Sequence, residues 1–121
     1  MMDGTFYDEL VHEWLAAVAE NAWVSLHYES PSLGGLGLGE IHGGGYLRKQ
    51  VTFSTPSART IWSLTNVKFT GLPANRLTHF GIWNAANQGR IQASGPLPTE
   101  VIIASGGGYL LAEGKLALSI Q

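Results

Sequence analysis

The chain has 121 residues, of which 45% are hydrophobic and 13% charged, and its formal net charge is -2. This length suits one domain, so we expect residues 1–121 to fold as a single unit. The absence of cysteine excludes disulfides, thiolate zinc sites and cysteine nucleophiles, and the few scattered basic residues argue against a nucleic-acid-binding protein. Charged residues fall well below the usual ~25%. Such a surface is typical of a protein that contacts other proteins.

The N-terminal segment is acidic and has no basic region, so we expect no signal peptide. No apolar run approaches the roughly 18–20 residues that cross a membrane, so we expect no membrane association. Residues 5–20 instead predict one amphipathic helix that Thr5 can cap. Its apolar side chains recur at spacings of three and four residues and form one stripe: Leu10, Val11, Trp14, Leu15 and Val18.

A short strand is predicted over residues 22–29, which are rich in aromatic and β-branched side chains. Alternation places Val24, Leu26 and Tyr28 on one face of this strand. Residues 30–45 follow as a glycine-rich loop, which we expect to become ordered against a partner.

Residues 46–121 alternate with a period of two and are interrupted by Gly and Pro turns. One predicted strand puts Phe80 and Ile82 on one face and His79, Gly81 and Trp83 on the other. With residues 22–29, this region predicts a mainly β fold: an antiparallel β-sandwich or a jelly-roll-like barrel, with one N-terminal amphipathic helix. The sequence GGGYL occurs twice, at residues 43–47 and 106–110, and we interpret both copies as a loop that leads into a strand.

No motif in the sequence predicts a catalytic, cofactor-binding or metal site. The run HGGGYLRK before Gln50 lacks the helix and hydroxyl of a phosphate-binding loop. His12 and Glu13 do not begin an HExxH motif, because Ala16 stands at the second histidine position. Asp3, Asp8, Glu9, Glu13 and Glu20 cluster on the helix, mostly as a solvated face, and the other carboxylates fall near loops: Glu29, Glu40, Glu100 and Glu113. Nothing in the sequence picks out a hydrolytic pair among them. We therefore predict no enzymatic activity and no cofactor.

Protein interface candidates come from the aromatic residues, the basic residues of one strand and the glycine-rich loop. Tryptophans either anchor the core or line a contact with a protein or a sugar. Arg48 is either a charge at a strand edge or an arginine that meets a neighbouring subunit. The predicted interface residues are Tyr46, Arg48, Trp62, Trp83, Leu36 and Leu38.

Four segments together resemble a family of small phage virion proteins. EIHGGGYLRKQVTFSTPS is similar to the family's E-x-x-GGGYxRQ-x-VTF-x-x-PS, and LTHFGIWNAANQGRI to its VTHFGI/LWDAATGG-x-L. NVKF and the segment from Ala93 to Ile120 resemble two further family segments, so the likeness covers roughly Glu40 to Ile120. Asn84 stands where the family usually has Asp, and SGGGY replaces its SGD.

This resemblance implies a non-catalytic structural protein of the virion that is assembled in the host cytoplasm. It would attach to the major capsid protein or to tail proteins, as a decoration or cement protein or as a fibre-like subunit, and form a homo-oligomer. The alternative is a receptor-binding module that uses Trp62 and Trp83 to hold a host surface glycan. A small hydrolase is a third hypothesis.

Overall fold

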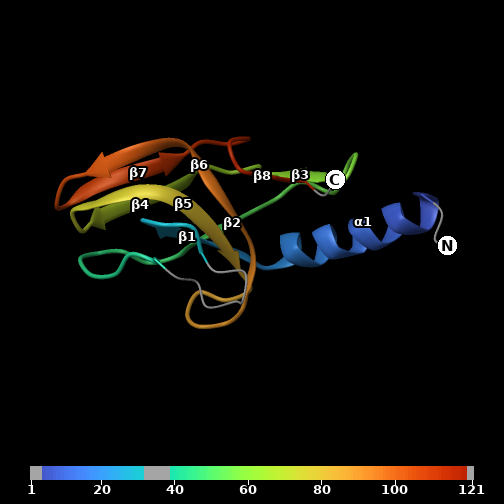
Figure 1. Cartoon of the computed structure of the whole chain (residues 1–121), viewed down its shortest axis with the longest axis horizontal. Helices are drawn as coiled ribbons and strands as arrows, with labels where there is room; N and C mark the ends of the chain where they lie inside the picture. The colour runs from blue at the N-terminus through green and yellow to red at the C-terminus, as the bar shows by residue number, and fades with distance from the viewer. Residues whose placement is uncertain (1–3, 32–38, 120–121) are drawn as a thin grey trace.

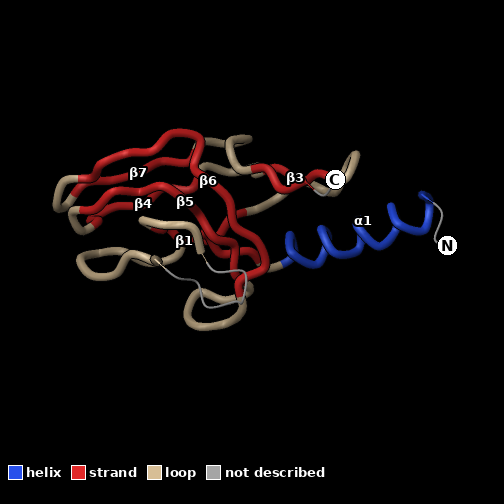
Figure 2. Tube along the Cα trace, in the orientation of Figure 1, coloured by secondary structure: helices blue, strands red, loops and turns tan. Residues whose placement is uncertain are grey.

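The structure is a computed structural model that describes residues 4–31 and 39–119. Its fold is mainly β with one N-terminal helix, as the sequence predicts, and its antiparallel sheets are stacked like a sandwich and do not close into a barrel (Figures 1 and 2). The elements are α1 (Gly4–Glu20), β1 (Ala22–His27), β2 (Lys49–Val51), β3 (Thr60–Trp62), β4 (Val67–Leu72), β5 (Asn75–Trp83), β6 (Ile91–Ile103), β7 (Gly107–Leu111) and β8 (Ala117–Ser119).

One four-stranded sheet has the order β2-β1-β5-β6, and the pairs β4-β7 and β3-β8 form two further antiparallel ribbons. The ribbon β4-β7 stacks on the larger sheet, while β3-β8 lies at the end of the molecule where α1 extends (Figure 1). We call the part formed by α1 and β3-β8 the arm. The buried side chains of the arm and of the stacked sheets belong to one hydrophobic cluster, so the arm and the sheets share a core.

Helix α1 packs against the β3-β8 ribbon with only part of its predicted stripe. Val11, Leu15 and Val18 are buried in the same cluster as residues of β3 and β8, but Leu10 is 44% and Trp14 39% exposed. The stripe is wider than the ribbon that covers it, because a two-stranded ribbon spans only one side of a helix. The predicted apolar stripe therefore has a buried part and an exposed part, and Leu10 and Trp14 lie in the exposed part.

Strand β1 is buried on both faces. Val24 and Leu26 are fully buried, as are Ser25 and His27 on the opposite face, whereas Tyr28 lies after the strand and is 47% exposed. β1 is an inner strand, hydrogen-bonded between β2 and β5. On the face of Ser25, the Trp83 side chain bonds Ser25 Oγ and Arg48 lies over the Trp83 ring. Phe80 on β5 is buried, as expected for a core residue.

Strand boundaries differ from the pattern in two places. The strand-like pattern over residues 59–71 corresponds to two strands, β3 and β4, in separate ribbons. Conversely, residues 91–103 form the single strand β6, which contains Pro96 and Pro98. Proline lacks the N–H that a central strand must donate, but β6 lies at the edge of its sheet, where that donor is not required.

The two GGGYL segments behave differently. The second leads directly into β7, but the first is followed by irregular residues before β2 begins at Lys49. Both glycine runs nevertheless contact the same irregular part of β4: the Gly45 N–H donates to Gly71 O at 2.6 Å, and the Gly106 N–H donates to Leu72 O at 2.7 Å. A Cβ at Gly44 would stand 2.8 Å from the Gly71 oxygen, so the close approach requires glycine there.

Candidate functional site

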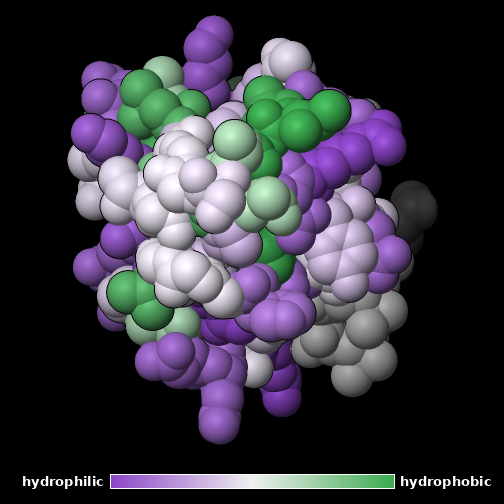
Figure 3. Space-filling model, turned by 90° about the vertical axis from the view of Figure 1, so that its left-hand side faces the viewer, coloured by the Kyte–Doolittle hydropathy of each residue, from purple (hydrophilic) through white to green (hydrophobic). Residues whose placement is uncertain are grey.

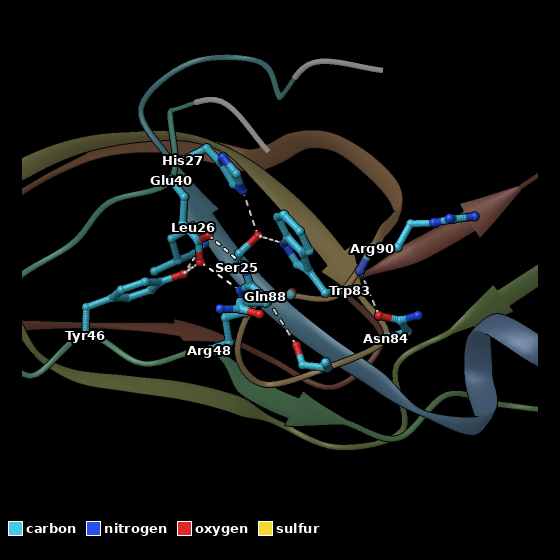
Figure 4. Close-up of polar contacts among 11 residues, drawn as sticks. Ser25, Leu26, His27, Glu40, Tyr46, Arg48, Trp83, Asn84, Gln88 and Arg90 are labelled. Carbon is cyan, nitrogen blue, oxygen red and sulfur yellow. Dashed lines mark hydrogen bonds and ion pairs between the residues drawn. The ribbon is translucent and has the colours of Figure 1, made fainter. Parts of the chain in front are cut away.

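The residues with the densest polar contacts surround the Glu40 carboxylate, and we call Glu40, Tyr46, Arg48, Trp83 and Ser25 the Glu40 cluster (Figure 4). Arg48 Nε and Nη2 each donate to a different Glu40 oxygen at 2.9 Å, a two-pronged ion pair. The Tyr46 hydroxyl donates to Glu40 Oε2 at 2.6 Å. The irregular backbone after the first glycine run allows Tyr46 and Arg48 to turn toward the same carboxylate.

Arg48 also holds the loop that follows β5. Its Nη1 donates to the carbonyl oxygens of Ala85 at 3.1 Å and Gln88 at 2.8 Å. Gln88 has a positive φ of 55°, an uncommon conformation for a residue with a side chain. The guanidinium lies 3.7 Å from the centroid of the Trp83 ring, which is close enough for a cation–π attraction. One arginine therefore joins the glycine-rich segment, the end of β5 and the loop beyond it.

The cluster continues into the sheet through Trp83. Its Nε1 donates to Ser25 Oγ at 2.8 Å, and Ser25 Oγ lies 2.6 Å from His27 Nε2. Gly81 pairs with Ser25 across the β1-β5 ladder. A Cβ at Gly81 would stand 2.6 Å from Ser25 Oγ, so this contact requires glycine at position 81 in the family-like segment THFGIW.

The charges of the cluster shift the pKa values of its acidic groups. Burial alone would raise the pKa of Glu40, but the hydrogen bonds from Arg48 and Tyr46 and the charge of Arg48 outweigh it and lower this pKa below its ordinary value. Burial, followed by the hydrogen bond and charge of Glu40, raises the pKa of the Tyr46 hydroxyl well above its usual range. At neutral pH the cluster therefore contains an ionised Glu40 and a protonated Tyr46.

The distance between Ser25 Oγ and His27 Nε2 is the distance expected between a nucleophile and its general base. Both residues are fully buried, and the Ser25 oxygen already accepts the hydrogen bond from Trp83. A substrate could not reach this hydroxyl without opening the sheet. In this position Ser25 Oγ joins β1 to β5 through its hydrogen bond with Trp83 Nε1.

The predicted interface residues fall into three groups. Tyr46, Arg48 and Trp83 come together in the Glu40 cluster, where the Arg48 side chain is 10% and Trp83 5% exposed. Trp62 lies apart from them, on β3 in the arm, and is 38% exposed. Leu36 and Leu38 lie outside the described residues.

The Glu40 carboxylate is absent from the sequence-based candidates, although both Tyr46 and Arg48 donate hydrogen bonds to it. The sequence feature that could have identified Glu40 is its position as the first residue of the E-x-x-GGGYxRQ segment. A pocket of about 270 Å³ lies beside it, lined by Glu40, Tyr46 and Arg48 and by the loop at Gln88. Within the described residues, no helix has the length and apolar character needed to cross a membrane.

Residues 5–119 match the sequence family described as podophage GP4 fiber I protein gp80. The chain belongs to this family. No curated protein shows significant similarity to the sequence. The matched residues span nearly all of the described fold and include both the arm and the stacked sheets.

Two of the segments that resemble phage virion proteins meet in the Glu40 cluster. Glu40, Tyr46 and Arg48 come from the first segment, and Trp83 comes from the second. Asn84, which departs from the usual Asp, accepts a hydrogen bond from the Arg90 N–H through Oδ1 at 2.8 Å. A carboxylate oxygen at this position can accept the same bond, so the loop geometry does not depend on the difference.

Proposed function

We propose that this protein is a non-catalytic subunit of a phage fibre, held in the virion by contacts with other virion proteins. Membership in the fiber I family supports a structural role in the virion. The observation that carries the proposal is the use of the family-like motif residues: Tyr46 and Arg48 both bind Glu40, and Arg48 also binds the loop after β5, so their polar groups serve the fold.

The non-catalytic part of the proposal is supported by how the polar groups are occupied. Arg48 donates to one carboxylate and two backbone carbonyls, and the buried Ser25 hydroxyl is bound by Trp83. Catalytic groups must instead be reachable by substrate. A glycan platform built on Trp62 and Trp83 is disfavoured because Trp83 is buried beneath Arg48.

The composition of purified particles tests the proposal. Quantitative mass spectrometry of virions should find the protein at a fixed ratio to the major capsid protein. A fibre subunit should be present in roughly tens of copies or fewer per particle, following the symmetry of a tail, whereas a capsid decoration would number in the hundreds. Absence from virions, or hundreds of copies, would overturn the assignment to a fibre.

A further inference from the structure

The exposed side of α1 combines an apolar seam with an acidic flank. Leu10, Trp14 and Ala17 are exposed and recur at spacings of four and three residues, so they share one face of the helix. Glu9, Glu13 and Glu20 are also exposed and lie along one side of that seam. On the other side of the seam lies the helix face that is buried against the β3-β8 ribbon.

The carboxylates of the acidic flank have no ion-pair partner among the residues that the structure describes. Glu9 and Glu13 are four residues apart, a spacing at which like charges destabilise a helix. Glu20 lies at the C-terminal end of α1, where the helix dipole disfavours a negative charge. Among residues 9–31 and 39–119, none of these three carboxylates forms an ion pair. α1 therefore presents a negative field beside an apolar surface.

The apolar seam continues into a groove. Trp14 lines a cavity of about 750 Å³ together with residues 92–98 of β6 and with Lys115 and residues 117–119 near β8. α1 projects from the stacked sheets, so this side of the arm is accessible (Figure 1). At the other end of the molecule, apolar side chains form separate patches among polar ones (Figure 3). The arm is where apolar surface, groove and charge coincide.

We propose that the α1 face formed by Leu10, Trp14 and Ala17, with the adjoining groove, docks onto an apolar segment of another virion protein that carries lysine or arginine beside Glu9 and Glu13. Charge complementarity selects this occupant. A second copy of the chain fits less well: in a two-fold antiparallel pair of α1 helices, equivalent flanks face each other, so the two acidic flanks would meet. The proposal rests on the function proposed above and adds the attachment surface and the charge of the partner.

Binding to particles that lack this protein tests the proposal. Virions are prepared from phage with the gene deleted, and purified full-length protein is added at about 0.1 M and about 0.5 M NaCl, where charge screening differs strongly. Glu13→Lys should weaken binding about tenfold at low salt, and Trp14→Ala about tenfold at both salt concentrations. Glu29→Lys, which makes the same charge change at an exposed position beyond β1, should bind like the wild type.

The outcomes separate this inference from the proposed function. Unchanged binding of both α1 variants, with normal binding of the wild type, overturns the docking surface and leaves the fibre assignment intact. Light scattering of the free proteins tests whether α1 binds a second copy of the chain. If the wild type forms an oligomer that Glu13→Lys or Trp14→Ala dissociates, the proposal that the partner is a different protein is overturned. Absence of the wild-type protein from native virions would instead refute the fibre assignment. Circular dichroism melts confirm that each variant is folded.

Discussion

At the scale of single residues, the Glu40 cluster explains why motif residues that look like contact residues are largely buried. Arg48 is charged and interrupts a strand-like pattern, which favours an exposed position. In the structure the Arg48 guanidinium is fully engaged. Two of its nitrogens donate to Glu40, the third donates to loop carbonyls, and the group lies over the Trp83 ring. An arginine can do this because its rigid fork fits a carboxylate with two parallel hydrogen bonds.

Arg48→Ala should therefore destabilise the isolated protein strongly. Removing one partner of a buried ion pair leaves the other charge uncompensated, which costs about 3–5 kcal/mol. The free energy of unfolding from urea titration measures the effect. Arg76→Ala is the matched control, because the Arg76–Glu100 pair is exposed on both sides and such pairs contribute about 0–1 kcal/mol. Equal losses for the two variants would show that the Glu40 cluster does not hold the fold.

Acid should weaken the same cluster. The pKa of Glu40 is lowered in the folded chain, so its contribution to stability is present above its unfolded pKa of about 4.5 and is lost as the pH falls through the folded pKa. Urea titrations between about pH 7 and pH 3 should show this loss. Glu40→Gln should be less stable at pH 7 and lose part of the acid dependence, while exposed Glu113→Gln should retain it. An unchanged slope in Glu40→Gln would contradict the assigned ionisation.

At the scale of elements, the hairpin turn before β3 stores local strain. Ser57 and Thr60 exchange two backbone hydrogen bonds, and the residues between them, Ala58 and Arg59, have φ values of 50° and 61°. Hairpin turns of this kind favour Asn and Gly, which tolerate positive φ. The turn fixes one end of the arm, and its residues carry a backbone penalty that glycine would remove.

Ala58→Gly should consequently stabilise the protein or leave it unchanged, although glycine usually destabilises. Relief of the positive φ is worth about 1 kcal/mol and opposes the added flexibility of the unfolded chain. Ala104→Gly, at an exposed turn residue without positive φ, is the control and should lose up to about 1 kcal/mol. Thermal unfolding of the two variants compares them. A larger loss in Ala58→Gly than in Ala104→Gly would contradict strain at this turn.

The sequence predicts most of the elements but not their contacts. Alternation correctly puts Phe80 in the core, and three- and four-residue spacing correctly predicts α1. The same spacing cannot separate Leu10 and Trp14 from the buried stripe, because the width of the packing partner decides exposure. The alternation of apolar and polar residues cannot predict the Glu40–Arg48 ion pair, because irregular backbone lies between the two residues.

At the scale of the whole molecule, the fold has two regions that differ in how their side chains are used. The stacked sheets contain the Glu40 cluster, which uses its polar groups internally. The arm exposes apolar and acidic side chains beside a groove. Family membership covers both regions, and we propose that the sheets give the subunit its shape while the arm attaches it.

A density map of the native virion, resolved well enough to trace this chain, tests the account most directly. We expect the subunit in a tail-associated fibre, with Leu10 and Trp14 of α1 buried against a different protein and with basic side chains of that protein beside Glu9 and Glu13. Arg48 should remain bound to Glu40 within the subunit. A map in which α1 faces solvent and the Glu40 cluster forms the contact with the neighbouring protein would contradict it.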